Sequence, residues 1–381
     1  MRFPWLIPTC AAGLVLIGLG AIGRGDALAG VETGGLAAKQ AVFACLAAGV
    51  FCGGCVVPPR WLRTAAPVLL AAAVGLLVLV YAFPPRGGSR RWIPLGPLLF
   101  QPSEFTKPVF VLALARYLAN RRSHRTTLGL IPPAVLTAVP VALILKEPDL
   151  GTALVFFPVF AAVLVASGAK RGHLSAAVVL GVLCLPALWA GMNAEQRSRV
   201  TALFTQSPLA DLGTAVRRGD GYHLHRSKEV YALGGVTGSN PVYGPGEEAV
   251  PDPAAYRLPA ARTDFVLCLV AERYGLPGTL GVLGLFATLV AAGLRVSAAA
   301  ADPFARLVAA GVTALLGSQA IINTAMTVGL TPVTGLALPL VSYGGSSLIF
   351  TALSLGLLCG AAGGRVEVHP DPLHFAGRVD R

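Results

Sequence analysis

The chain has 381 residues, of which 55% are hydrophobic and only 13% are charged. A soluble domain usually contains about a quarter charged residues, so this composition excludes an ordinary soluble protein. Apolar runs near the length of a membrane-spanning helix, about 20 residues, recur from one end of the chain to the other. The sequence therefore predicts an all-α, polytopic membrane protein.

The net charge of +12 does not indicate nucleic-acid binding, because the basic residues gather in short connections between apolar runs. Arg60 with Arg63, and Lys170 with Arg171, are examples. Such clusters fall in alternate connections, which is the bias expected of cytoplasmic loops. The pattern predicts a multi-pass protein of the cytoplasmic membrane with both termini in the cytoplasm. Its basic loops could also contact anionic membrane lipids.

About ten spans are expected in chain order. The first three cover 5–22, 37–57 and 65–83, and the first resembles a cleavable signal but is longer than a usual signal core. Spans four to seven cover 101–118, 130–145, 153–167 and 176–191. The last three cover 264–294, 307–328 and 348–360, after a long extracytoplasmic loop over 191–263. We expect residues 1–362 to form a single transmembrane domain, followed by a cytoplasmic tail over 363–381.

Three arginines lie in the connection 84–100, which should face outward: Arg86, Arg90 and Arg91, followed by Trp92. An interfacial tryptophan beside arginines is often an anchor at the level of the lipid head groups. Alternatively, the guanidinium groups meet an anionic substrate, since their fork geometry suits phosphate oxygens. Taken alone, this connection slightly favours the interpretation of Trp92 and its arginines as a membrane anchor.

Charged residues also occur at the ends of spans four and five. Glu104 and Lys107 are three residues apart, so they share a helix face and could neutralise each other. Lys107 lies inside an apolar stretch, which favours an inward, paired position. Glu147 and Asp149 fall in a very short link between spans five and six. That link is either a solvated turn or a group of residues facing a shared polar cavity.

Asp264 lies where the long polar loop ends and span eight begins. An acid at this boundary is costly unless it is paired or lines a wet cavity, so it is a candidate functional residue. The alternative is a first-turn aspartate that interacts with the helix dipole and caps the amides after it. Position alone leaves both interpretations open.

Residues 329–347 combine helix breakers with hydroxyl groups between spans nine and ten. Irregular backbone at this depth is tolerated where it is buried in protein or lines a cavity, although packing by small residues is the alternative. With both termini cytoplasmic, all these polar motifs face outward. Their convergence predicts an outward-facing polar cavity for an anionic, amphipathic ligand.

These motifs resemble those of the SEDS family, the RodA/FtsW/SpoVE group of bacterial cell-wall proteins. The matching segments are 91–93, 101–104 with Lys107, 148–152, 263–265 and 339–347. The resemblance implies a peptidoglycan glycosyltransferase that polymerises lipid II into glycan strands at the outer face of the cytoplasmic membrane, for cell elongation or division. It also implies a class B penicillin-binding protein as the partner transpeptidase.

On this resemblance Asp264 corresponds to the essential aspartate of the family, and we expect it to act as the general base. The metal requirement is open, although a divalent cation such as Mg²⁺ or Mn²⁺ could stabilise the pyrophosphate leaving group. The candidate substrate-binding residues are Arg90, Arg91, Trp92, Glu104, Lys107, Glu147, Asp149, Arg262, Thr263, Ser342, Tyr343, Ser346 and Ser347.

The chain departs from the family pattern at several positions. An acidic residue is usual where Ala260 stands, a histidine where Arg262 stands, and a glutamine where Glu147 and Arg226 stand. Two alternative functions stay open: a lipid II transporter, and a non-catalytic scaffold of the cell-wall synthesis complex. A transporter would favour polar residues along a full path, whereas the residues found here gather at one rim.

Overall fold

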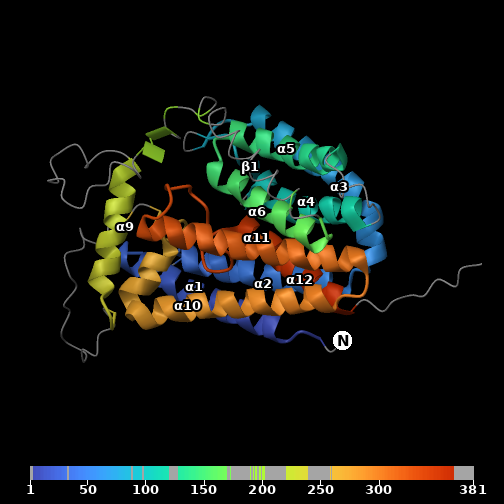
Figure 1. The fold of residues 1–381 in the computed structure, drawn as a ribbon. Helices are drawn as coiled ribbons and strands as arrows, with labels where there is room; N and C mark the ends of the chain where they lie inside the picture. The colour runs from blue at the N-terminus through green and yellow to red at the C-terminus, as the bar shows by residue number, and fades with distance from the viewer. Residues whose placement is uncertain are drawn as a thin grey trace, which may run out of the picture.

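Long apolar helices, packed side by side, make up most of the structure (Figure 1). The computed structural model describes residues 3–31, 34–86, 89–96, 98–119, 128–169, 220–238, 258 and 260–363, with a few isolated residues between 172 and 201. Nine helices of the bundle lie in these described residues: α1 (Leu6–Leu28), α2 (Leu36–Val56), α3 (Pro59–Leu79), α4 (Pro102–Ala119), α5 (Ile131–Lys146), α6 (Leu150–Ala166), α10 (Val266–Ala299), α11 (Pro303–Val328) and α12 (Gly345–Gly363).

The predicted all-α membrane architecture is confirmed. Seven helical segments of the described chain are long and apolar enough to cross a membrane. Two of them include short 3₁₀ turns, η1 (Val80–Ala82) after α3 and η3 (Leu128–Leu130) before α5. The shorter α6 and the more polar α4 pack among these segments. Each predicted span thus corresponds to a helix, except the seventh, 176–191, which lies outside the described residues apart from Trp189.

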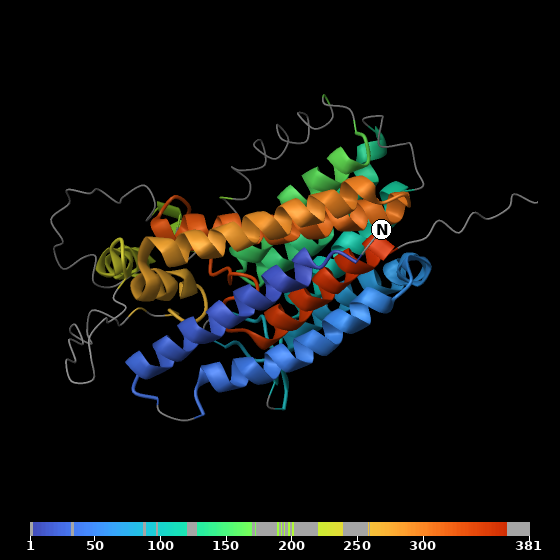
Figure 2. The same ribbon diagram turned by 90° about the horizontal axis from the view of Figure 1, so that it is seen from below.

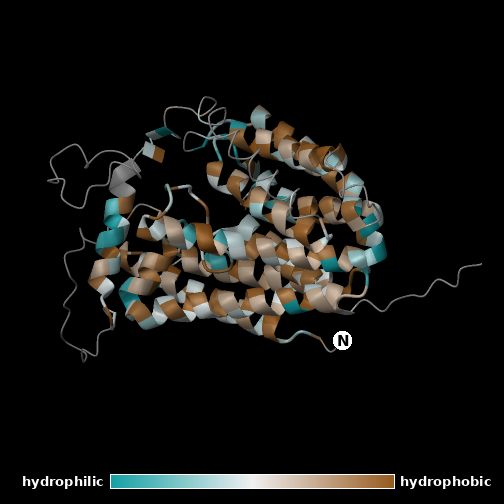
Figure 3. Ribbon diagram, viewed as in Figure 1, coloured by the Kyte–Doolittle hydropathy of each residue, from teal (hydrophilic) through white to brown (hydrophobic). Residues whose placement is uncertain are grey.

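The core of the bundle forms around α11, which packs against α4, α6, α10 and α12. Most of the apolar part of α11 is buried, whereas most of α2 is exposed. Large apolar side chains such as Val42 and Leu46 on α2, and Val68 on α3, face outward. The helices are mostly apolar along their length, and polar residues gather on α9 and near many helix ends (Figure 3). An apolar outer surface of this kind suits lipid rather than water.

Close backbone contact joins α2 to α12, which run side by side (Figure 2). A Cβ atom on Gly356 would lie 2.3 Å from the carbonyl oxygen of Phe51 and 3.0 Å from the Cα atom of Gly54. Small residues allow this approach in membrane helices, where packing rather than hydrophobic burial drives association. The contact holds the second half of α12 against the end of α2.

Two elements occur in connections for which no secondary structure was predicted. The connection 84–100 contains an antiparallel hairpin of β1 (Ile93–Leu95) and β2 (Leu98–Phe100), in which Ile93 pairs with Phe100. The long loop 191–263 contains the helix α9 (Asp220–Gly234), which lies across the ends of α10 and α11 (Figure 1).

The first turns of α10 are set at an angle to the rest of that helix. Gly275 adopts φ +63 inside α10, and its backbone lies against Val236 and Gly238, just after α9. The left-handed conformation favours glycine, because a Cβ atom would be strained there. This kink sets the segment Val266–Tyr274, which directly follows Asp264, apart from the long apolar part of the helix.

Candidate active site

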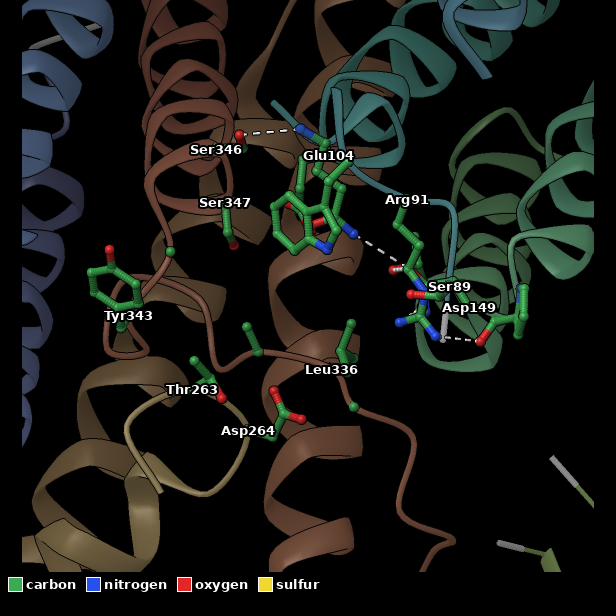
Figure 4. Close-up of a pocket in the computed structure, with 17 residues that line it drawn as sticks. Ser89, Arg91, Glu104, Asp149, Thr263, Asp264, Leu336, Tyr343, Ser346 and Ser347 are labelled. Carbon is green, nitrogen blue, oxygen red and sulfur yellow. Dashed lines mark hydrogen bonds and ion pairs between the residues drawn. The ribbon is translucent and has the colours of Figure 1, made fainter. Parts of the chain in front are cut away.

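A cavity of about 320 Å³ opens at the end of the bundle where α4, α6 and α12 begin. That volume lies near the lower limit of small-ligand pockets and has room for a sugar-sized group. The hairpin connection, the residues before α10 and the segment 335–347 complete its wall (Figure 4). Many of the predicted site residues line it: Arg91, Trp92, Glu104, Asp149, Thr263, Asp264, Tyr343, Ser346 and Ser347.

Asp264 is held in a tight turn just before α10. The carbonyl oxygen of Ala260 accepts hydrogen bonds from the amides of Thr263, Asp264 and Phe265, at 3.0–3.2 Å. The helix begins at Val266, so Asp264 lies outside its first turn. The partly buried Asp264 side chain points into the cavity (Figure 4). Ala260, where the family usually has an acidic residue, adopts φ +55, a conformation that aspartate and asparagine tolerate better than alanine.

Ser342 joins this turn to the segment before α12 and does not line the cavity. Its hydroxyl donates to the carbonyl oxygen of Thr263 at 2.5 Å and accepts from the amide of Leu338 at 2.9 Å. The amide of Tyr343 donates to the carbonyl oxygen of Arg262 at 2.9 Å. These bonds bring two segments distant in the sequence together as neighbouring parts of one wall.

Gln40 was not predicted as a site residue, yet it fixes the same wall from α2. Its side chain is 2% exposed. Its Nε2 donates to the carbonyl oxygen of Ser342 at 3.0 Å, and its Oε1 accepts from the amide of Gly344 at 3.1 Å. A polar residue in an apolar run is the sequence signal that could have found it.

The opposite wall is built around Arg91. Its Nε donates to the carbonyl oxygen of Glu147 at 3.1 Å and its Nη2 to that of Pro148 at 2.5 Å, while Nη1 lies 3.9 Å from Asp149 Oδ1. The Asp149 carboxylate also accepts from the amide of Thr152 at 3.1 Å and so caps α6. Arg91 therefore holds the link between α5 and α6 in place. Its neighbour Arg90 is exposed, lies outside the cavity lining and donates to the carbonyl oxygen of Tyr81.

Glu104 and Lys107 form the ion pair expected from their spacing, with 2.7 Å between Nζ and Oε1. Both side chains are buried, but only Glu104 lines the cavity. Cations thus hold two carboxylates of the described lining: Lys107 holds Glu104 and Arg91 holds Asp149. In the part of the chain that the structure describes, no three His, Cys, Asp or Glu residues gather into a metal site.

Arg262 turns away from the cavity toward α1. Its Nη1 lies 2.6 Å from Oδ1 of Asp26, and its aliphatic stem packs over Gly25. Asp26 is 5% exposed and also accepts from the amide of Ala37 at 2.8 Å. The arginine that replaces the usual histidine therefore ties the Asp264 turn to the connection between α1 and α2.

We expect this ion pair to contribute measurably to stability. Asp26→Ala should lower the free energy of unfolding more than Arg262→Ala, because it also removes the acceptor for the Ala37 amide. The double variant should lose less than the sum of the two single variants, by about 0.5–3 kcal/mol. Chemical unfolding of the four proteins in detergent measures this coupling, and strict additivity would contradict the pairing.

Glu147 is fully buried just behind the Arg91 wall and does not line the cavity. Neither carboxylate oxygen has a hydrogen-bond partner in the described structure. Burial raises the pKa of Glu147 from 4.5 to about 8; the charge of Asp149 adds to this shift and the charge of Arg91 opposes it. Glu147 is therefore mostly protonated near neutral pH, which makes it resemble the glutamine usual at this position.

Glu147→Gln should make stability less dependent on pH. Folding raises the pKa of this carboxyl, so below pH 4.5 it is protonated in both the folded and the unfolded state and does not lower the free energy of unfolding. Its destabilising effect grows as the pH rises and levels off once the pH passes 8. That cost is about 4–5 kcal/mol at most. The parent should lose thermal stability between pH 5 and pH 8, and Glu147→Gln should lose clearly less. Glu229→Gln, at a partly exposed position on α9, is the control, and an equal loss in parent and Glu147→Gln would refute the assignment.

The chain is similar to known proteins over nearly its whole length. The family model for FtsW, RodA and SpoVE, described as "Cell cycle protein", matches residues 4–365. The chain is 35% identical over 329 residues to "Probable peptidoglycan glycosyltransferase FtsW" of Geobacter sulfurreducens, covering 84% of this chain and 83% of that protein. It is also 35% identical over 312 residues to "Peptidoglycan glycosyltransferase MrdB" of Escherichia coli K12, covering 79% of each.

Solved structures show the same fold. A chain described under "Structural coordination of polymerization and crosslinking by a peptidoglycan synthase complex" matches with a TM-score of 0.76 and 29% identity, covering 95% of this chain and 98% of that one. The rod shape determining protein RodA of Thermus thermophilus matches with a TM-score of 0.68 and 29% identity, covering 96% and 99%. The chain belongs to the FtsW/RodA/SpoVE family of cell cycle proteins.

Proposed function

We propose that this chain is a peptidoglycan glycosyltransferase that polymerises lipid II, for cell elongation or division. The observation that carries the proposal is the position of Asp264, whose side chain faces a polar cavity also lined by the hydroxyl groups of Tyr343, Ser346 and Ser347, at and just before the start of α12 (Figure 4). The activity named for the relatives from Geobacter sulfurreducens and Escherichia coli supports it. A cavity at one end of the bundle suits a ligand whose polar head enters while its lipid stays in the membrane.

Asp264 acts as the general base in this proposal. The acceptor sugar hydroxyl attacks the anomeric carbon of the donor and gives its proton to the Asp264 carboxylate. The bond from that carbon to the pyrophosphate oxygen breaks, and the polyprenyl pyrophosphate leaves with the electron pair. Arg91 is the one cationic side chain in the described lining, and its position opposite Asp264 favours a role at the pyrophosphate.

We place the cavity at the outer face of the cytoplasmic membrane, with both termini in the cytoplasm. Basic residues at the opposite end of the bundle, among them Arg63 and Arg116, support this placement. The charge rule assigns such an end to the cytoplasm. A class B penicillin-binding protein is the proposed partner. The similar solved complex, described as coordinating polymerisation and crosslinking, supports a partner that crosslinks. Residues 1–362 form one transmembrane domain in this proposal, and the family match over 4–365 supports it.

Purified protein with fluorescent lipid II tests the function directly. With its transpeptidase partner present, we expect a ladder of glycan strands on a gel, because polymerisation adds one disaccharide at a time. Absence of any polymer in both the presence and the absence of the partner would refute the proposal. Flipping of lipid II across liposomes without polymer would instead favour the transporter alternative.

A further inference from the structure

Asn323, on α11, binds two segments of the cavity wall, the turn that contains Asp264 and the segment that contains Leu336. Its Nδ2 donates to the carbonyl oxygen of Asp264 at 2.8 Å and to that of Leu336 at 2.7 Å. The side chain is 0% exposed. Both Asp264 and Leu336 line the cavity, whereas Asn323 does not. One buried amide therefore holds both parts of the wall from behind.

The orientation of this amide follows from its surroundings. Two carbonyl oxygens face it, and only an NH₂ group can donate to both, because a carbonyl oxygen would meet them with like partial charge. The Asp264 carbonyl stands just before α10, and the amide of Cys268 donates to the carbonyl oxygen of Phe265 at 2.9 Å. Without the amide both carbonyl oxygens would lose a donor, and the bond to Leu336 is buried. Losing a buried hydrogen bond is costly, so the backbone would shift.

We propose that Asn323 is a positioning residue for glycosyl transfer, which sets the Asp264 carboxylate at the reacting atoms by holding its backbone carbonyl and that of Leu336. The proposal rests on the proposed function. The proposal extends that function by assigning a role to a residue that touches neither the cavity nor the substrate. A misplacement of about 1 Å at a reacting group can cost on the order of 100-fold in rate, so losing this clamp should act mainly on kcat.

Two substitutions separate positioning from packing. Asn323→Leu keeps the number and branching of the side-chain heavy atoms and removes both donors, and it should lower kcat by about 10- to 100-fold with KM within about threefold. Asn323→Asp also keeps the shape, and its protonated carboxyl still donates one hydrogen bond. As pH rises, that carboxyl loses its proton and becomes an anion beside two carbonyl oxygens. The kcat of Asn323→Asp relative to the parent should therefore fall with rising pH, whereas the ratio for Asn323→Leu should stay flat.

Gln319→Leu is the matched control, because it makes the same amide-to-leucine change one turn earlier on α11, at a side chain that is 3% exposed. We expect its kcat within about twofold of the parent. Should Asn323→Leu fail to fold, the pH series of Asn323→Asp decides alone. The proposal is overturned if Asn323→Leu retains the kcat of the parent, if Gln319→Leu loses as much, or if Asn323→Asp shows the pH profile of the parent.

A second readout does not depend on activity. A hydrophobic carbodiimide labels carboxyl groups, and mass spectrometry follows its reaction at Asp264. Asn323→Leu should change the labelling rate of Asp264 by more than about threefold, and Gln319→Leu should not. If the parent forms no polymer, the proposed function fails, and this labelling result alone decides whether Asn323 positions Asp264. Equal labelling in all three proteins would refute it.

Discussion

Asp264→Asn should lower the rate of glycan polymerisation by about 10²- to 10⁴-fold, the usual contribution of a positioned general base. The amide has the shape of the carboxylate but cannot take the proton of the acceptor hydroxyl. The hydrogen bonds of the Ala260 turn run through the backbone, so the substitution leaves the turn intact. Initial rates with fluorescent lipid II measure the effect.

The control for this variant is Asp302→Asn. Asp302 caps α11 at the opposite end of the bundle, where its side chain accepts from the amides of Phe304 and Ala305. Asparagine also caps helices well, so this variant should polymerise near the parental rate. An Asp264→Asn protein that polymerises as fast as Asp302→Asn would show that Asp264 is not the base.

Lys107→Met should lower the free energy of unfolding by about 3–5 kcal/mol, because it leaves the buried Glu104 carboxylate without its cation. Methionine keeps most of the volume of the lysine stem, so the loss comes from the charge. The double variant Glu104→Gln/Lys107→Met removes both charges and should recover most of the stability. Thermal or chemical unfolding in detergent measures the three proteins.

An exposed ion pair supplies the comparison for Lys107→Met. Arg226 and Glu229 pair on α9, with side chains 29% and 38% exposed, and exposed pairs are worth about 0–1 kcal/mol. Arg226→Met should therefore change stability little. Two results would contradict a stabilising role for the buried pair. One is a loss of stability in Lys107→Met as small as that in Arg226→Met, and the other is a double variant no more stable than Lys107→Met.

The helical fold could be predicted because a membrane helix needs an uninterrupted apolar run. The predicted boundaries were close: span eight, for example, was expected to begin at Asp264 and α10 begins at Val266. The hairpin of β1 and β2 could not be found, since strands of three residues carry no periodic signal. Nor could α9, a polar helix that packs by direct backbone contact: a Cβ atom on Gly234 would lie 2.1 Å from the carbonyl oxygen of Ala271.

The sequence was sufficient to predict which end of the bundle the candidate site occupies. Glu104, Asp149, Asp264 and the hydroxyl-rich turn each lie at a helix start, and the bundle brings those starts together. The ion pair of Glu104 and Lys107 could be predicted from their spacing, but partners distant in the sequence could not, because they depend on tertiary packing. Arg262, expected at the substrate, pairs with Asp26 on another helix.

The residues that hold the wall from behind had a weaker signal. Gln40 and Asn323 are polar residues inside largely apolar runs, and a polar group there must find a partner within the protein. The sequence does not say which backbone group that partner is. Only the fold places the Gln40 amide on the Ser342 carbonyl and the Asn323 amide on the Asp264 carbonyl.

A structure of the Asp264→Asn protein with bound lipid II tests the central claim most directly, since the substitution should retain substrate and stop the reaction. We predict that the acceptor hydroxyl lies about 2.6–3.2 Å from the side chain at position 264, within reach of proton transfer, with the pyrophosphate of the donor toward Arg91. Sugar and pyrophosphate bound on another face of the bundle, away from this cavity, would contradict the account.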